Sequence, residues 1–294
     1  MQKQHSTLSD IVPKAPGTKP RRLRRRNVLP GFGLSMGYTI FYLSIIVLIP
    51  LSTLVFKTFD MTWEKFVSSV TSPRVLQAYW VSISAAFVAS LINLVMGLVI
   101  AWALTRYKFP GRKILDALVD IPFALPTAVA GISLATLYSP VGWLGQFTEK
   151  AGIHIINTWG GITTALIFIG FPFVVRTVQP VLKELELEIE EAALSLGADR
   201  WQLFWRVILP ALIPSMLTGF TLSFARCIGE YGSVIFIAGN LPMKTEIAPL
   251  LIMAKLDQFD YAGASAIALM LLVISLVFLV LLNLLQHWRN KVPV

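Results

Sequence analysis

Two long stretches without a charged residue constrain this chain more than any other feature. Residues 34–56 and 79–105 contain no Asp, Glu, Lys or Arg. A helix of roughly 20 residues crosses a hydrocarbon layer about 30 Å thick, so each stretch is long enough to span a bilayer. Because 55% of the residues are hydrophobic and only 14% are charged, the chain cannot cover a water-facing surface with charge. We therefore predict an all-α integral membrane protein.

Six apolar segments of spanning length follow one another along the chain. They are residues 34–56, 79–105, 115–138, 159–181, 209–238 and 261–286. The third segment is interrupted by Pro122, Pro126 and Gly131, and Asp116 and Asp120 stand at its start. Proline removes a backbone donor and clashes with the preceding turn. We expect this segment to be bent or broken and to face the bundle interior, where neighbours can satisfy the freed carbonyls.

The basic residues indicate the orientation of the spans. The net charge is +9, and the densest cluster comprises Arg21, Arg22, Arg24, Arg25 and Arg26. Because arginine resists translocation, residues 1–33 are predicted to form a cytoplasmic tail, largely disordered and without a cleaved signal peptide. An even number of spans places the C-terminus on the same side. Cations at the ends of apolar runs favour contact with membrane lipid rather than binding of nucleic acid.

The residue types needed for covalent or redox chemistry are scarce. Cys227 is the only cysteine, and His5, His154 and His287 have no spacing that would converge on one metal ion. The chain has no Gly-x-x-x-x-Gly-Lys-Ser/Thr phosphate loop and no recognisable catalytic constellation. We therefore expect no metal, no cofactor and no enzymatic activity in this chain, which disfavours a membrane-embedded hydrolase.

The connection between the fourth and fifth spans, residues 182–208, is patterned rather than merely polar. Apolar residues recur at three- and four-residue steps on one predicted helix: Leu182, Leu185, Ile189, Ala193 and Leu196. Gly197 ends that helix, and Asp199 with Gln202 predicts a capping-box start for a second short helix. The apolar side of the second helix comprises Trp201, Phe204, Trp205 and Ile208. Two helices meeting at a glycine would form a knob that another protein can grip, whereas a plain amphipathic connector is the alternative.

This loop carries a spaced motif. It reads Glu191-Ala192-Ala193, then Gly197, and after nine further residues Val207-Ile208-Leu209-Pro210. The spacing resembles the cytoplasmic loop of ABC importer permeases, with Val207 in place of the family's isoleucine. The resemblance implies a type I ABC importer permease fold over residues 34–288, with residues 182–208 as the coupling loop that docks in a groove of an ATPase subunit. ATP and Mg²⁺ would be used by that partner.

The same resemblance assigns roles within the motif. It implies that Glu191 is the polar contact to the ATPase and that Ala192 and Ala193 permit close approach. Gly197 would permit the turn. Leu209 and Pro210 would complete the motif at the start of the fifth span.

Three further stretches resemble the sulfate and thiosulfate branch of that family, and the similarity covers about residues 29–286. The stretches are Asp120 to Gly131, Gly229 to Asn240, and Phe259 to Tyr261. The first resembles the T-type permease subunit more than the W-type. The resemblance implies two ATPase subunits, a second, W-type permease and an external sulfate-binding protein, in a bacterial plasma (inner) membrane or a plastid inner membrane. A molybdate or tungstate permease is the nearest alternative.

An ion-coupled secondary carrier acting alone is an alternative of a different class. It is disfavoured because the spans offer one acid, Glu230, rather than a proton relay. Arg226 lies four residues before Glu230, so on one helix face the two could simply neutralise each other. In the other interpretation Arg226 supplies positive potential to a passing dianion, with Glu230 moderating it. Pro122, Pro126 and Thr127 are predicted to line the same pathway.

Overall fold

The structure is a computed structural model that describes residues 31–59 and 61–289, and within these residues it is helical with no strand. It contains two compact units, Met1–Pro50 and Leu51–Val294, which are described separately. Of the predicted basic tail, residues 1–33, only Gly31, Phe32 and Gly33 fall within the described residues. The arginine cluster of the tail lies outside them.

The first apolar segment is helical from Phe32 to Phe59. It consists of α1 (Phe32–Leu43), the π-helical turn η2 (Ser44–Leu48) and α2 (Ile49–Phe59). In the wide turn the Ile49 N–H bonds to the Ser44 carbonyl. Pro50 follows at once, and it has no N–H and would clash with the carbonyl four residues earlier in a regular helix. The π turn therefore lets the helix continue past this proline.

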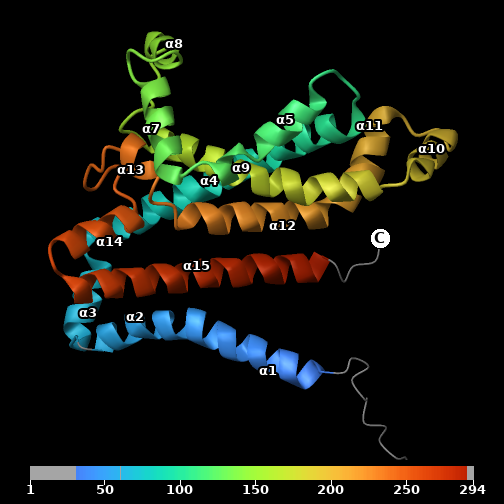
Figure 1. Cartoon of the computed structure of the whole chain (residues 1–294). Coiled ribbons are helices and arrows are strands. Elements are labelled where there is room, and N and C mark those ends of the chain that lie inside the picture. Colours follow the sequence, from blue (N-terminus) through green and yellow to red (C-terminus); the bar gives the residue numbers. More distant parts are fainter. Residues whose placement is uncertain (1–30, 60, 290–294) are drawn as a thin grey trace, which may run out of the picture. The chain divides into compact units, whose positions relative to one another are not determined.

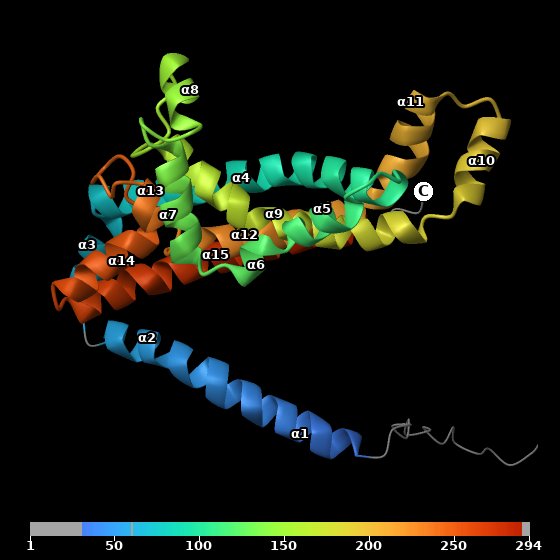
Figure 2. The same cartoon turned by 45° about the horizontal axis from the view of Figure 1, so that its top comes forward.

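Three long helices form the centre of the second unit: α4 (Pro73–Arg106), α9 (Trp159–Glu184) and α12 (Leu209–Ile228). They lie side by side in both views (Figures 1 and 2). Glycines allow this close packing, as small residues do at helix contacts in membranes. A Cβ on Gly97 would come within 2.7 Å of Val174, and one on Gly170 within 2.5 Å of the Ser223 hydroxyl.

The second unit also contains shorter helices and one further long helix. Among them are α3 (Trp63–Thr71), α8 (Gly145–Lys150), α13 (Val234–Ile237), α14 (Ala248–Asp257) and α15 (Tyr261–Arg289). The long α15 packs on α14, α12 and α3. Asp260 caps its start: the carboxylate accepts from the Gly263 N–H at 3.0 Å and from the Lys255 ammonium at 2.9 Å. These bonds hold the pKa of Asp260 below its usual value.

The third predicted segment is broken, as the prolines indicated. It comprises α5 (Arg112–Val119), α6 (Ile121–Ala124) and α7 (Thr127–Tyr138), with breaks at Asp120 and at Leu125–Pro126. Within the described residues five helices are long and apolar enough to cross a membrane, and this segment is not among them. Those five are Phe32–Phe59, Pro73–Arg106, Trp159–Glu184, Arg200–Ile228 and Tyr261–Leu284.

The helix of the predicted fifth segment, residues 209–238, ends earlier than predicted. α12 begins at Leu209, as a continuation of the helix that starts at Arg200, and ends at Ile228, where Gly229 is the C-cap. The chain then turns through residues 229–233 before α13. The apolar sequence continues past Ile228, so hydropathy alone extended the helix, whereas the glycines at 229 and 232 favour its end.

Candidate coupling surface and translocation residues

The acidic helix of the coupling loop is α10 (Leu187–Ser195), and Gly197 makes the turn that follows it. The Ala198 N–H bonds to the Ala193 carbonyl, and the Gly197 N–H bonds to the Leu194 carbonyl. This pair of bonds is the Schellman motif, which requires a left-handed residue. Gly197 has φ +89°, and no atom lies within 4 Å of the Cβ that another residue would place there. Glycine is therefore favoured at position 197 by its left-handed backbone conformation and not by a lack of room for a side chain.

The motif residues of α10 face different surroundings. Glu191 and Ala192 are exposed, whereas Ala193 and Glu190 are half-buried. Several large apolar side chains on or beside this helix are also exposed: Leu187, Ile189, Leu194 and Leu196, the last to 89%. Figure 2 shows α10 and α11 together at one end of the second unit, away from α7 and α8. An exposed apolar patch with carboxylates beside it is typical of a surface that binds another protein.

The predicted helix stripe from Leu182 to Leu196 is wrong, because these residues do not share one helix. Leu182 is buried as part of α9, and the chain leaves helical geometry at Leu185 and Glu186. Ile189 and Leu196 are exposed rather than facing the core. The apolar residues do recur at three- and four-residue steps, but the first of them belongs to α9 and later ones belong to α10.

The second helix of the loop begins with the predicted capping box. The Asp199 carboxylate accepts from the Gln202 N–H at 2.7 Å, and the Asp199 N–H donates to the Gln202 side chain at 3.3 Å. This helix, α11 (Arg200–Leu203), is not separate, because the π turn η3 (Phe204–Ile208) joins it to α12. Leu209 and Pro210 start α12 directly after that turn, both half-buried.

Arg226 and Glu230 form an ion pair, with 2.6 Å between the Nη1 and Oε2 atoms. Arg226 lies in the last turn of α12, but Glu230 lies beyond its end, so the two do not occupy a continuous mid-span helix as expected. Glu230 is only 3% exposed, and its Oε1 atom accepts from the Ser233 N–H at 3.0 Å and the Ser233 hydroxyl at 3.2 Å. The Arg226 side chain is 37% exposed. Both oxygens of the Glu230 carboxylate therefore have partners, whereas the Arg226 side chain remains partly exposed.

The turn that carries Glu230 packs against α7. A Cβ on Gly232 would come within 2.2 Å of the Thr127 hydroxyl, and one on Gly131 within 2.4 Å of the Ser233 carbonyl. These two close approaches bring Thr127 to the segment that holds Glu230. Pro126 is exposed at the N-cap of α7. Pro122 is buried in α6, which packs against α9 instead.

Sequence reasoning missed an ionic cluster around Arg176. Arg176 donates to both Asp120 carboxylate oxygens, to the Asp116 carboxylate and carbonyl, and to Gln179, each at 2.7 Å. The guanidinium therefore ties α5 and the following break to α9. Two spacings mark polar helix faces, because Asp116 and Asp120 lie one turn apart, as do Arg176 and Gln179, but they do not show that the two faces meet.

Sequence reasoning also missed that residues 238–247, here named the pinned loop, are fixed by long-range bonds. Arg74 donates to both oxygens of Glu246 at 2.7 Å, and the Glu246 side chain is only 1% exposed. The Thr245 hydroxyl donates to the Ala238 carbonyl at 2.6 Å and accepts from the Leu241 N–H at 3.1 Å. A buried carboxylate with a bidentate arginine holds the loop in one position.

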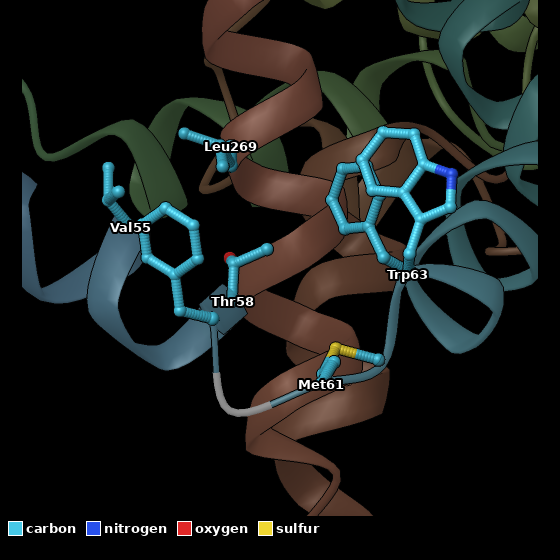
Figure 3. A pocket seen from close by; sticks show the side chains of 7 residues that line it. Val55, Thr58, Met61, Trp63 and Leu269 are labelled. Atoms are coloured by element: carbon cyan, nitrogen blue, oxygen red, sulfur yellow. The ribbon is translucent and has the colours of Figure 1, made fainter.

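An apolar cavity of about 330 Å³ lies elsewhere in the second unit. Its lining comprises Val55, Thr58, Phe59, Met61, Trp63, Phe66 and Leu269, and Figure 3 shows Trp63, Met61 and Leu269 around it. These lining residues carry no charge and include none of the candidate site residues. The cavity is therefore unsuited to hold an anion.

Comparison with known families decides what kind of protein carries this loop. Residues 93–291 match the family described as binding-protein-dependent transport system inner membrane component. The chain belongs to this family. As a member, it is the permease subunit of an ABC transporter, in which ATP hydrolysis belongs to a partner subunit.

Several relatives match this permease over most of its length. The sulfate transport system permease protein CysT of Escherichia coli is 53% identical over 261 residues, which covers 89% of this chain and 94% of that protein. The protein of the same name from Salmonella typhimurium is 54% identical over 261 residues, covering 89% and 94%. A probable sulfate transport system permease protein cysT from Nephroselmis olivacea is 48% identical over 253 residues, covering 86% and 89%.

Solved structures of ABC transporters show the fold of the permease. A chain of a bacterial alginate ABC transporter, solved with an alginate-bound periplasmic protein, superposes with a TM-score of 0.73 at 19% identity, covering 89% of this chain and 96% of that one. A chain of the MetNI methionine ABC transporter gives 0.55 at 18% identity, covering 74% and 96%. The predicted type I ABC importer permease fold is therefore confirmed.

Proposed function

We propose that this permease is the T-type membrane subunit of an ATP-driven sulfate importer. The observation that carries the proposal is the match to proteins named sulfate transport system permease along 89% of the chain at 53% identity. Such coverage includes the coupling loop and the turn with Glu230. The complex would contain two ATPase subunits, a W-type permease and an external sulfate-binding protein, and thiosulfate would be a further substrate.

In this proposal the chain spans the bacterial plasma membrane with both termini in the cytoplasm. Residues 182–208 then lie on the cytoplasmic side, where the ATPase subunits bind. The exposed leucines of α10 and the exposed Glu191 support docking of a partner there. ATP and Mg²⁺ are used by that partner, and closure of the ATPase pair rocks the spans between inward- and outward-facing arrangements.

Uptake of radiolabelled sulfate by proteoliposomes that contain the complete complex tests the proposal. We expect uptake that requires ATP and binding protein and that thiosulfate competes away. Uptake that persists without ATP and stops with an uncoupler would instead identify a secondary carrier. Stronger competition by molybdate than by sulfate would favour the molybdate alternative.

Glu191→Gln tests the docking surface. We expect less ATPase subunit to copurify with the variant, because the outward-facing carboxylate is lost while the fold of α10 is kept. Glu184→Gln is the matched control, since Glu184 is an exposed acid at the end of α9 outside the motif. Equal copurification in the two variants would exclude Glu191 as the contact.

For the pathway, we propose that Arg226 offers positive potential to the passing dianion. Its outward exposure, and the full bonding of Glu230 by Arg226 and Ser233, support this role. A double variant, Arg226→Gln with Glu230→Gln, removes both charges without stranding a buried carboxylate. We expect it to assemble with the ATPase but to lose sulfate uptake. Normal uptake would mean that the two residues only neutralise each other.

A further inference from the structure

The two neighbouring glutamates of α10 have different surroundings, and this difference points to a second role. Glu191 is exposed, whereas the Glu190 carboxylate is 17% exposed and accepts a hydrogen bond from the Arg106 guanidinium, itself 16% exposed. Arg106 is the last residue of α4. Among the described residues, Glu190 is the acid of α10 for which a long-range partner is found. A largely buried ion pair thus connects the coupling loop to the end of a central helix.

Arg106 is also linked, through Trp102, to the π turn that joins the coupling loop to α12. Its guanidinium carbon lies 5.7 Å from the centroid of the Trp102 ring, within the range of a cation–π contact. Trp102 in turn packs edge-on against Phe204 of the π turn, with 5.9 Å between ring centroids. One arginine is therefore linked to α10 on one side and, through Trp102, to the turn that leads into α12.

The pair lies on a different side of α10 from the exposed motif residues. Successive residues of an α-helix point about 100° apart, so Glu191 and Ala192 point away from Glu190 and are exposed. Without the ion pair between Arg106 and Glu190, the Schellman turn and the capping box would keep their local hydrogen bonds while α10 changed its angle to α4. Docking and transmission would then be separable properties of the loop.

We propose that Arg106 and Glu190 are positioning residues that transmit movement of the docked coupling loop to α4, and through Trp102 and Phe204 to α12. This inference rests on the proposed function, because it assumes that a separate ATPase grips α10. It differs from the docking role of Glu191, since Glu190 faces inward and touches this chain. Loss of the pair should leave ATPase binding intact and weaken the link between ATP hydrolysis and sulfate movement.

The test measures two quantities in proteoliposomes that hold the complete complex: radiolabelled sulfate uptake and ATP hydrolysis, each with and without sulfate-loaded binding protein. For Arg106→Gln and Glu190→Gln we expect normal copurification of the ATPase and a several-fold fall in sulfate moved per ATP hydrolysed. Lys108→Gln, which removes an exposed cation two residues from Arg106 and outside the coupling loop, should leave that ratio unchanged. Arg106→Lys keeps the charge and should restore part of the ratio.

The combined variant Arg106→Gln with Glu190→Gln should be no worse than either single variant, because both changes break one contact. A combined loss equal to the product of the single losses would overturn the proposal, as would an unchanged ratio in the single variants. Failure of the single variants to bind the ATPase would also overturn it, since the pair would then only maintain the fold. If the unmodified complex showed no ATP-dependent uptake, the proposed function itself would fail, independently of the pair.

Discussion

The coupling loop and the pinned loop both connect helices of the second unit, but they are held in opposite ways. The turns of the coupling loop are made by bonds between near neighbours, such as Ala198 to Ala193 and Asp199 to Gln202, and the apolar side chains of Leu187 and Leu196 are exposed. The pinned loop is fixed by Arg74, 172 residues from Glu246 in the sequence, and its Thr245 and Glu246 side chains are buried. The ion pair between Arg106 and Glu190 is the exception, since it joins α10 to α4. A segment whose turns are held by local bonds can move as a unit. The comparison indicates that one loop is suited to be displaced by a partner and the other to stay still.

Arg74→Ala should give the largest effect on stability. It leaves the buried Glu246 carboxylate without its bidentate partner. An unpaired buried charge costs about 3 kcal/mol. Thermal unfolding of the purified complex would measure the loss. Lys244→Ala, an exposed cation of the same loop, should cost far less. Equal shifts in the two variants would show that the pinned loop is not held by Arg74.

Alanine at Gly239 or at Gly197 should give the next largest losses of stability, and the two variants can be compared directly. Gly197 and Gly239 both have positive φ, so alanine at either position costs about 1 kcal/mol in backbone energy. A Cβ on Gly239 would also come within 2.2 Å of the Asn157 side-chain oxygen, whereas one on Gly197 meets no atom within 4 Å. We expect Gly239→Ala to lower the free energy of unfolding by about 1 kcal/mol more than Gly197→Ala. Chemical denaturation of the two variants would decide, and a larger loss at Gly197 would contradict the comparison.

Hydrogen-bonding side chains of the two loops sharpen the contrast. Thr245→Val removes the hydroxyl that serves both Ala238 and Leu241 in a buried setting, and unpaired buried groups cost about 1–3 kcal/mol. Asp199→Ala removes only an exposed helix cap, at about 1 kcal/mol. Hydrogen exchange should show opening around the pinned loop in the first variant and fraying confined to α11 in the second. Long-range loosening in the Asp199 variant would be unexpected.

Leu196→Ser should have the smallest effect on stability. Its side chain is 89% exposed, so the free energy of unfolding should change by no more than about 0.5 kcal/mol. Binding of the ATPase subunit, measured by copurification, should nevertheless weaken because a leucine is lost from the docking surface. Val141→Ser provides the control, since Val141 is similarly exposed but lies outside the coupling loop. Unchanged ATPase binding in the Leu196 variant would remove this residue from the surface.

Local patterns in the sequence predicted local structure well. Asp199 and Gln202 form their capping box, Gly197 adopts the left-handed turn, and the third segment breaks beside Pro126. Each depends on residues within a few positions of one another. The ion pair between Arg226 and Glu230 was predicted for the same reason, although the helix ends between them.

Contacts between distant residues were not predictable from this one sequence. Arg176 meets Asp116 across 60 residues, and Arg106 meets Glu190 across 84. Nothing in their neighbourhoods distinguishes a cation that orients a span from one that bonds to another helix. The end of α12 was missed for a related reason, because an apolar run reads the same whether the chain continues straight or reverses direction.

The π turn Phe204–Ile208 also affects the direction in which residues farther along α12 point. In an α-helix one added or removed residue swings everything beyond it by about 100°, which would carry Arg226 to another side of the bundle. A single wide turn absorbs one surplus residue without that swing. The direction in which Arg226 points, relative to α10 and α11, therefore depends on five residues far from it. Lengthening or shortening the chain there would turn the cation to another face of the bundle although the sequence around Arg226 is unchanged.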